Sequence, residues 1–307
     1  MSQKMIDRLI EKIRQTRNPT AVGLDTKLDY LPPSYRARFA ALDTFEGAAK
    51  AIFSFNKALI DAVCDLVPCV KVQAAYYEMY SVPGMAAFEK TIRYAREKGL
   101  VAIVDAKRND ISSTASAYAA AYLGQTALEN GAKARAFEGD FLTVNPYFGD
   151  DGVLPFLNTD NGVFVLVKTS NPSSSQIQNL PLADGRLVYQ MMGDLVEGWG
   201  AAQMGENGYS NVGAVVGATH PAELLELRAR MPGTFFLIPG YGAQGGTAPD
   251  LCGGFDSRGL GGVVNSSRGI LCAWKKQNTD DFAAAARQAV LDMREDLQSA
   301  LRSAGKS

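Results

Sequence analysis

The sequence predicts an α/β protein with a (β/α)8 TIM-barrel fold and extended βα loops, and three observations support this prediction. Short apolar runs alternate with amphipathic stretches along the chain, which is typical of parallel β-α-β units. Eight strand-like runs occur, and eight repeats fit a closed barrel better than an open doubly wound sheet. The 307 residues are enough for one large barrel domain.

Each element can be placed by its pattern. The expected strands are Thr20–Asp25, Cys69–Gln73, Val101–Asp105, Phe141–Asn145, Val163–Lys168, Val212–Val216, Phe235–Ile238 and Gly262–Asn265. The expected helices are Glu46–Val67, Met85–Lys98, Ser112–Asn130, Asp151–Leu157, Leu187–Gly205, Pro221–Arg230, Ala248–Gly253 and Asp280–Arg302. An N-terminal helix should precede them, since Met5, Leu9, Ile10 and Ile13 share one face. We therefore expect a single domain, residues 1–307, with long loops at 28–44 and 171–187 on the catalytic face.

The composition argues against several classes of protein. With 31 basic and 32 acidic residues the formal net charge is −1, so no overall positive field favours a nucleic acid polymer. No apolar run is long enough for a membrane span, and the N-terminus lacks the apolar core of a signal peptide. The cysteines form no C-x-x-C pair, which favours free thiols in a reducing compartment. These features predict a cytoplasmic protein that has no membrane partner.

The most informative segment is the third strand, Val101–Asp105, with the residues after it. An apolar run ends in Asp105, Lys107 and Asp110. Because strand side chains alternate between faces, Asp105 and Lys107 should point to the same side. Buried charges are unfavourable unless they pair or face a solvated or ligand-filled cavity. A structural ion pair is one explanation, and a reaction centre is the other.

Other strand ends favour the reaction centre. Asp25 ends the first strand, Lys71 lies in the second, and Asn145 ends the fourth. In a (β/α)8 barrel the carboxyl ends of the strands form the rim of the active site, so these side chains should meet Asp105 and Lys107 there. Such a convergence of polar groups is hard to explain as a set of unrelated structural roles.

The loops after the last two strands resemble a phosphate site. The first is rich in glycine over residues 239–246, and the second contains Arg268. Glycines let backbone N–H groups approach an anion, and a guanidinium adds a charged bidentate donor. In this fold the seventh and eighth loops commonly bind phosphate.

Taken together, these motifs resemble the orotidine 5′-phosphate decarboxylase family, in particular its longer bacterial subgroup. The resemblance runs from about Val22 to Ile270 and is carried by Gly23-Leu24-Asp25, Lys71, the Asp105-x-Lys107-x-x-Asp110-Ile111 string, the loop 239–246 and Ser267-Arg268-Gly269. It implies a carboxy-lyase that converts orotidine 5′-phosphate to uridine 5′-phosphate and CO2 in de novo pyrimidine biosynthesis. It also implies that neither a metal nor an organic cofactor is required.

The same resemblance assigns a catalytic array. The family's alternating charges fall on Lys71, Asp105, Lys107 and Asp110. Lys107 would protonate C6 of the pyrimidine, and Asp105 would lie beside the departing carboxylate. An ammonium aimed at a developing carbanion stabilises charge that appears only in the transition state.

The resemblance assigns the substrate contacts as well. Asp25 would bind the ribose, Ser170 the pyrimidine amide, and Gln244 with Arg268 the phosphate, while Ile111 and Pro239 would form an apolar wall. The family is dimeric with shared sites, so Asp110, Ile111 and Thr114 would reach into the partner's site. Asn145 is also expected in the pocket, without a family role.

Two other functions remain open from the residues themselves. A related phosphate-sugar barrel enzyme, such as a hexulose-phosphate synthase-like aldolase, can share the Asp-x-Lys-x-x-Asp string but typically uses a metal or a catalytic histidine. The only histidine, His220, precedes Pro221 at a helix start, where a capping or surface role is expected. A non-catalytic nucleotide-binding barrel is disfavoured because the whole charged array is present. Roles are not assigned to Lys27, Lys168 and Arg108.

Overall fold

A closed parallel barrel forms the body of the molecule. The computed structural model describes residues 3–306, and the strands follow the order β1-β10-β9-β8-β7-β6-β3-β2 around the barrel. Their bounds are β1 Thr20–Gly23, β2 Cys69–Gln73, β3 Val101–Arg108, β6 Phe141–Val144, β7 Gly162–Lys168, β8 Val212–Val216, β9 Phe236–Pro239 and β10 Gly262–Ser266. Every neighbouring pair is parallel. The predicted fold class and all eight predicted strand positions are thus confirmed.

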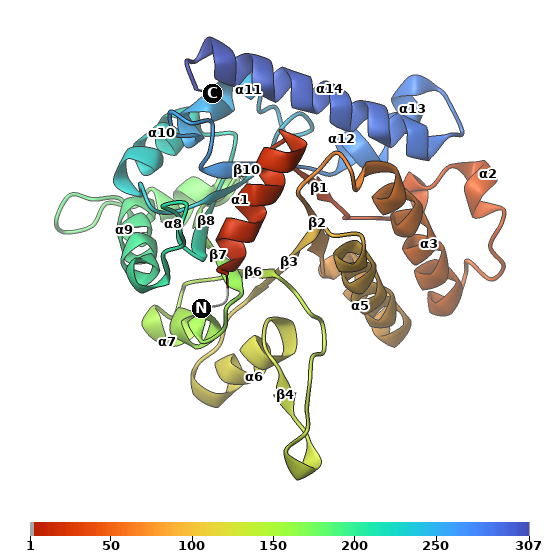
Figure 1. Ribbon diagram of the computed structural model, residues 1–307, viewed down its shortest axis with the longest axis horizontal. Coiled ribbons are helices and arrows are strands. Elements are labelled where there is room, and N and C mark those ends of the chain that lie inside the picture. Colours follow the sequence, from red (N-terminus) through yellow and green to blue (C-terminus); the bar gives the residue numbers. More distant parts are fainter. Residues whose placement is uncertain (1–2, 307) are drawn as a thin grey trace.

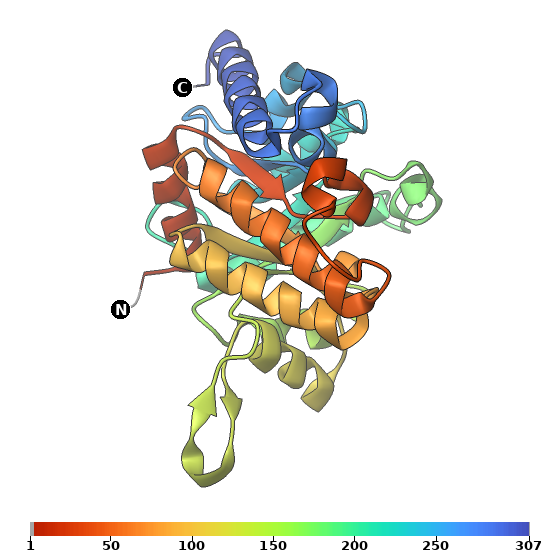
Figure 2. The same cartoon turned by 90° about the vertical axis from the view of Figure 1, so that its right-hand side faces the viewer.

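Helices surround the barrel (Figures 1 and 2). The α-helices are α1 Met5–Thr16, α2 Pro33–Arg36, α3 Phe45–Val63, α4 Ala75–Glu78, α5 Ser81–Glu97, α6 Ser112–Tyr122, α7 Asp150–Val153, α8 Ser175–Gln178, α9 Val188–Gly200, α10 Pro221–Arg230, α11 Ala248–Leu251, α12 Arg268–Leu271, α13 Ala273–Gln277 and α14 Phe282–Ser303. Short 3₁₀ turns are η1 Leu28–Tyr30, η2 Glu129–Gly131, η3 Leu154–Leu157, η4 Pro172–Ser174, η5 Ala201–Gln203 and η6 Cys252–Gly254. None of the helices within residues 3–306 has both the length and the apolar character needed to cross a membrane.

The alternation of side chains along the strands divides the core in two. In β3, Val101 and Ile103 point into the barrel, whereas Ala102 and Val104 pack beneath the outer helices. All four are fully buried. Because the residues alternate, the next inward position after Ile103 is Asp105, so the strand pattern itself directs that carboxylate into the barrel mouth.

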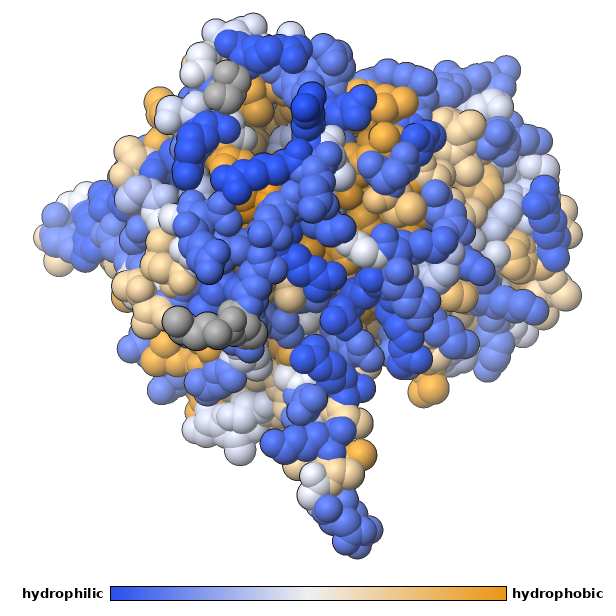
Figure 3. All heavy atoms as spheres, viewed as in Figure 1, coloured by the Kyte–Doolittle hydropathy of each residue, from blue (hydrophilic) through white to orange (hydrophobic). Residues whose placement is uncertain are grey.

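Helix α1 closes the amino end of the barrel. Ile6, Leu9 and Ile10 are completely buried against the interior cluster, as the predicted amphipathic face requires. Asp7 is also buried, and its carboxylate accepts the backbone N–H groups of Glu206 and Asn207 at 3.0 and 2.9 Å. The helix crosses in front of the strands in Figure 1, and the surface around it is mostly hydrophilic in Figure 3. The barrel is therefore plugged at one end, which leaves the other for a ligand.

The predicted helix Ser112–Asn130 is wrong beyond its first half. Helix α6 ends at Tyr122, and the chain then forms an antiparallel hairpin, β4 Thr126–Ala127 with β5 Lys133–Ala134. The hairpin projects from the body of the molecule (Figure 2). Asn130 and Gly131 both have positive φ at its tip, and Asn-Gly is a strong signal for a tight hairpin turn. That signal was present in the sequence and outweighs the helical pattern around it.

Other differences concern the ends of helices and the long loops. Helix α3 ends at Val63 rather than Val67, and α9 ends at Gly200 rather than at Gly205. The two segments expected as loops contain short helices, η1 and α2 in 28–44 and η4 and α8 in 171–187. The short helices α4, α12 and α13 were not predicted, because four or five residues carry too little periodicity to be recognised.

Candidate active site

A cavity of about 510 Å³ opens at the carboxyl ends of the strands. Eight of the predicted site residues line it: Asp25, Lys71, Asp105, Lys107, Ser170, Pro239, Gln244 and Arg268. They come from the ends of β1, β2, β3, β7 and β9 and from the loops that follow β9 and β10. The expected convergence of strand ends at one mouth is therefore present in the fold.

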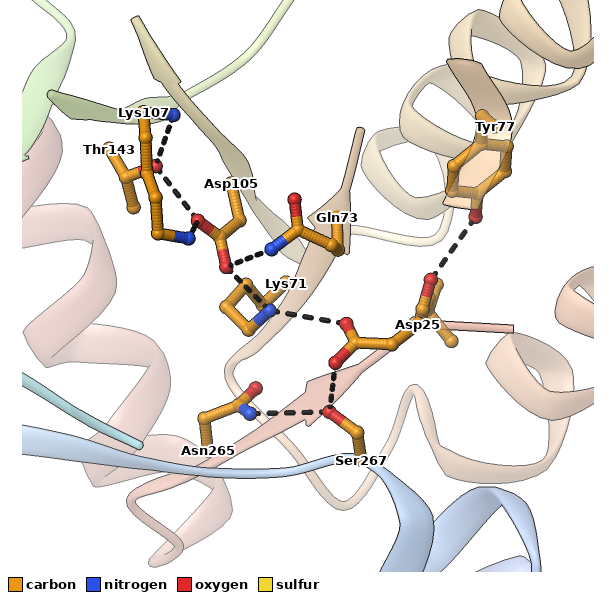
Figure 4. Close-up of polar contacts among 10 residues, drawn as sticks. Asp25, Lys71, Gln73, Tyr77, Asp105, Lys107, Thr143, Asn265 and Ser267 are labelled. Carbon is orange, nitrogen blue, oxygen red and sulfur yellow. Dashed lines mark hydrogen bonds and ion pairs between the residues drawn. The ribbon is translucent and has the colours of Figure 1, made fainter. Parts of the chain in front are cut away.

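The charged side chains form a continuous chain of ion pairs across this mouth (Figure 4). Lys71 Nζ lies 3.2 Å from Asp25 Oδ1 and 2.8 Å from Asp105 Oδ2. Lys107 Nζ lies 2.6 Å from Asp105 Oδ1. Acid and base thus alternate in the order Asp25, Lys71, Asp105, Lys107, and neighbouring members neutralise one another.

Burial and charge act against each other in this chain. Burial opposes ionisation of Asp105, but the ammonium groups of Lys71 and Lys107 outweigh it and hold the pKa of Asp105 well below its ordinary value. Burial likewise opposes the charged form of Lys71, but Asp105 and Asp25 outweigh it and raise the pKa of Lys71. Both groups therefore remain charged at neutral pH.

Lys107 differs from the other members in its exposure and its backbone. Its side chain is 45% exposed, whereas that of Lys71 is 5% exposed, so the Lys107 ammonium faces the open cavity. Its backbone has φ +48°, in the left-handed region, which costs a non-glycine residue about 1 kcal/mol. The pairing of β3 with β6 shifts register between Val104 and Arg108 at this point. A strained bulge at the strand end thus presents the amine to the cavity.

Asp25 is fixed from both sides. Its Oδ1 contacts Lys71, and its Oδ2 accepts the hydroxyl of Ser267 at 2.8 Å. Gly23 permits this arrangement, because a Cβ at that position would lie only 2.0 Å from Ser267 Oγ. The glycine of the Gly23-Leu24-Asp25 motif is therefore required by the close approach of β1 to the loop after β10.

The two predicted phosphate loops lie side by side at the rim. The guanidinium of Arg268 donates from Nη2 to the carbonyl of Ala243 at 3.2 Å, which joins the loop after β10 to the loop after β9. In the latter loop Gly240, Gly242 and Gly245 all have positive φ. These backbone conformations favour glycine and let the loop fold tightly beside the guanidinium.

Four predicted site residues lie outside the cavity. Asp110, Ile111 and Thr114 are at the start of α6, where Ile111 is 49% exposed and the Asp110 carboxylate accepts the N–H of Ile111. Asn145 is exposed, and its Oδ1 accepts the N–H of Tyr147 at 3.1 Å. Asp25, rather than Asp110, is thus the second acid of the charge chain within one subunit.

Sequence reasoning missed two polar residues that hold Asp105. Gln73 Nε2 donates to Asp105 Oδ2 at 3.0 Å, and the hydroxyl of Thr143 donates to Oδ1 at 2.9 Å. The alternation that pointed to Asn145 applies equally to Thr143, two residues earlier. Because β6 ends at Val144, only Thr143 points inward and lines the cavity. Gln73 had a comparable signal, because it is the polar end of β2.

The residues without an assigned role divide into three kinds. Lys27 lines the cavity, where its ammonium lies over the ring of Tyr76. Arg108 pairs with Glu78 and stacks on Tyr122 at the rim. Lys168 is buried away from the cavity and donates to Asn179 at 2.5 Å.

His220 and the cysteines lie outside this chemistry. His220 is the N-cap residue of α10, but its side chain makes no capping hydrogen bond. All four cysteines are free thiols, as expected. Within residues 3–306, no group of three or more His, Cys, Asp or Glu side chains is arranged to hold a metal ion.

The plugged parallel barrel and the charged cavity at its open end define a (β/α)8-barrel enzyme. Residues 40–279 match the model of the orotidine 5′-phosphate decarboxylase / HUMPS family, and the chain belongs to this family. It is 44% identical over 302 residues to the orotidine 5′-phosphate decarboxylase of Petrotoga mobilis, a match that covers 96% of this chain and 98% of that protein.

Two further comparisons agree. The orotidine 5′-phosphate decarboxylase of Clostridium botulinum is 43% identical over 300 residues, covering 96% of this chain and 99% of that protein. The structure of Leishmania donovani OMP decarboxylase superposes with a TM-score of 0.75 at 30% identity, covering 97% of this chain and 99% of that one. The family expected from the motifs is confirmed by these comparisons.

Proposed function

We propose that this enzyme is a carboxy-lyase that converts orotidine 5′-phosphate to uridine 5′-phosphate and CO2, a step of de novo pyrimidine biosynthesis. The observation that carries the proposal is the alternating chain from Asp25 to Lys107, with the Lys107 ammonium facing the cavity. The relatives at 40 to 44% identity are named for this same reaction.

The chemistry follows from the position of the ammonium. The bond between C6 and the carboxylate breaks, CO2 leaves, and the electron pair stays on C6. Lys107 stabilises that charge and then transfers a proton to C6, after which the neutral amine regains a proton from water. Because the negative charge on C6 develops only in the transition state, a cation fixed beside C6 accelerates the reaction without binding the substrate more tightly. The reaction therefore needs no cofactor.

Asp105 has a second part in this scheme. It is held between Lys71 and Lys107, and Gln73 and Thr143 fix its two oxygens. A substrate carboxylate placed next to it would be repelled in the ground state and relieved when CO2 departs. Its lowered pKa keeps Asp105 ionised for this purpose.

The rest of the cavity suits a nucleoside monophosphate. Asp25 and Ser170 both line the cavity. In the proposed complex Asp25 would bind the ribose and Ser170 the pyrimidine amide. Gln244 and Arg268 lie together at the glycine-rich rim and would bind the phosphate. Pro239 supplies the apolar wall from this subunit.

We further propose a homodimer with shared active sites, in which Asp110, Ile111 and Thr114 complete the site of the partner. Ile111 and Thr114 are exposed and Asp110 is half-buried at the start of α6, and all three lie outside the cavity of their own subunit, which supports this. An equal mixture of Lys107→Ala and Asp110→Ala subunits should recover about one quarter of the wild-type activity, since about half of the re-formed dimers are hybrids and each hybrid has one intact site of two. No recovery on mixing would count against shared sites.

Two other features belong to the proposal. We place the enzyme in the cytoplasm, consistent with its four free thiols. We also propose that the chain is one domain, because α1 and α14 both pack on the same barrel: α1 covers its interior cluster and α14 contacts β1 and α3.

The test is the loss of the orotate chromophore when the pure protein is incubated with orotidine 5′-phosphate in EDTA. Turnover that persists in EDTA supports cofactor-free decarboxylation. A requirement for added divalent metal would indicate an aldolase-like relative instead. Binding of uridine 5′-phosphate without turnover would indicate a nucleotide-binding barrel that is not an enzyme.

A further inference from the structure

The hydroxyl of Thr143 bonds both the backbone of Lys107 and the carboxylate of Asp105. Thr143 lies in β6 and is 1% exposed. Its Oγ1 accepts the backbone N–H of Lys107 at 3.0 Å and donates to Asp105 Oδ1 at 2.9 Å. A hydroxyl has one proton, and since the N–H of Lys107 occupies an acceptor position, that proton points to the carboxylate. Figure 4 shows both bonds.

The first bond supports the strained backbone of Lys107. At this residue φ is +48°, and the register shift between β3 and β6 removes it from the regular ladder. The Lys107 N–H lies in a part-buried position, where a donor without an acceptor is unfavourable. The threonine hydroxyl takes the place of the missing carbonyl and so holds the bulge in the conformation that directs the side chain to the cavity.

The second bond fixes the carboxylate that faces the same side chain. Asp105 Oδ1 accepts from both the Thr143 hydroxyl and the Lys107 ammonium. The other oxygen is held by Lys71 and Gln73. Without the hydroxyl, Oδ1 would be held by Lys107 alone, and the ammonium and carboxylate could move together away from the reacting carbon.

We infer that Thr143 is a positioning residue for the proposed decarboxylation, because its one hydroxyl fixes the backbone of Lys107 and the carboxylate of Asp105 relative to each other. It acts through these two groups and not through the substrate. The kinetic test of this inference rests on the proposed function. The claim that the hydroxyl fixes both groups relative to each other does not.

The kinetic test compares Thr143→Val with Thr143→Ser. Valine keeps the shape and removes the hydroxyl, so kcat should fall about 100-fold, with KM changed less than about threefold, as expected for a misplaced reacting group. Serine keeps the hydroxyl and should stay within about threefold of the wild type. Thr91→Val is the matched control, because Thr91 is equally buried in α5, its hydroxyl donates to the Ala87 carbonyl of the same helix, and it does not line the cavity.

A merely structural role would lower thermal stability in Thr143→Val and Thr91→Val alike and leave kcat of the folded protein unchanged. A kcat within threefold of the wild type in Thr143→Val, or equal losses in the valine and serine variants, would overturn the inference.

Amide hydrogen exchange separates this inference from the proposed function. The Lys107 amide should be protected in the wild type and in Thr143→Ser, and should exchange at least about tenfold faster in Thr143→Val. If the wild type fails to act on orotidine 5′-phosphate, the proposed function fails and exchange still decides the role of Thr143. Unchanged Lys107 protection in Thr143→Val would contradict it.

Discussion

Asp105 and Asp140 are both buried aspartates in the barrel wall, one at each end, and their pKa values move in opposite directions. At the mouth, burial is outweighed by Lys71 and Lys107, and the pKa of Asp105 is lowered. At the plugged end, burial prevails over the Ala102 N–H and the guanidinium of Arg96, and the pKa of Asp140 is raised. Both side chains are less than a tenth exposed.

The difference shows that burial of a charge does not by itself identify an active site. Asp140 accepts the Ala102 N–H at 2.9 Å and lies 3.3 Å from Arg96 Nε, contacts that join neighbouring strands and helices. Asp105 contacts two ammonium groups, one of which faces a cavity. A cation that faces a cavity is what distinguishes the mouth from the plugged end.

The largest effect is expected for Lys71→Ala at the mouth. This change leaves Asp25 without its ammonium partner and leaves Asp105 with the ammonium of Lys107 alone. Decarboxylation should fall at least about 10³-fold, and the free energy of unfolding should fall by about 3 kcal/mol. Kinetics together with urea unfolding measures both, and a variant with normal activity would remove the basis for treating the mouth as catalytic.

A smaller effect is expected for Arg268→Ala at the rim. The guanidinium lies beside the glycine-rich loop, is exposed, and contacts the Ala243 carbonyl. If it binds the phosphate, its loss should lower kcat/KM about 100-fold, mainly through KM, with little change in stability. Arg38→Ala is a control at an arginine outside the cavity, whose guanidinium lies over the ring of Tyr35. A loss confined to kcat would argue against phosphate binding.

At the plugged end we expect a substitution to lower stability and to leave activity unchanged. Asp7→Ala removes the acceptor of the Glu206 and Asn207 N–H groups. The free energy of unfolding should fall by about 2 kcal/mol because these part-buried N–H groups lose a charged acceptor. Activity of the folded protein at a temperature well below unfolding should not change. A matching fall in kcat would mean that the two ends of the barrel are not independent.

The smallest effect is the pH dependence of the two aspartates. The folded protein holds Asp105 ionised below its ordinary pKa of 3.8, so this stabilisation is present above that pH and is lost as pH falls. Asp140 keeps its proton in the folded state above 3.8, so its stabilisation is present at low pH and is lost as pH rises.

The measurement is urea unfolding of the wild type, Asp105→Asn and Asp140→Asn between about pH 6 and pH 3.5. The stability advantage of the wild type over Asp105→Asn should shrink as pH falls. Its advantage over Asp140→Asn should grow over the same range. If both stability differences changed with pH in the same direction, the two carboxylates would not differ as described.

The barrel and most of its mouth were predictable because both follow from periodicity. Alternation in β3 places Asp105 on the inner face, and the fold brings the strand ends together, so Asp25, Lys71 and Lys107 were expected to meet. The β4–β5 hairpin was not predicted, although its Asn130-Gly131 turn was readable.

The remaining residues depend on tertiary geometry that no local pattern contains. Asn145 was chosen as the polar end of its strand, yet it lies outside the cavity, and Thr143 takes the inward position instead. The positive φ of Lys107 arises from the register shift between β3 and β6, which a single strand sequence does not specify.

The central claim is that the exposed ammonium at the end of β3 carries out the reaction. Its most direct test is the initial rate of orotidine 5′-phosphate decarboxylation in EDTA by the wild type, Lys107→Ala and Lys90→Ala, a control at an exposed lysine of α5. We predict that Lys90→Ala matches the wild type, and that Lys107→Ala remains folded and loses at least about 10³-fold in rate. A folded Lys107→Ala protein that still decarboxylates at the wild-type rate would contradict the claim.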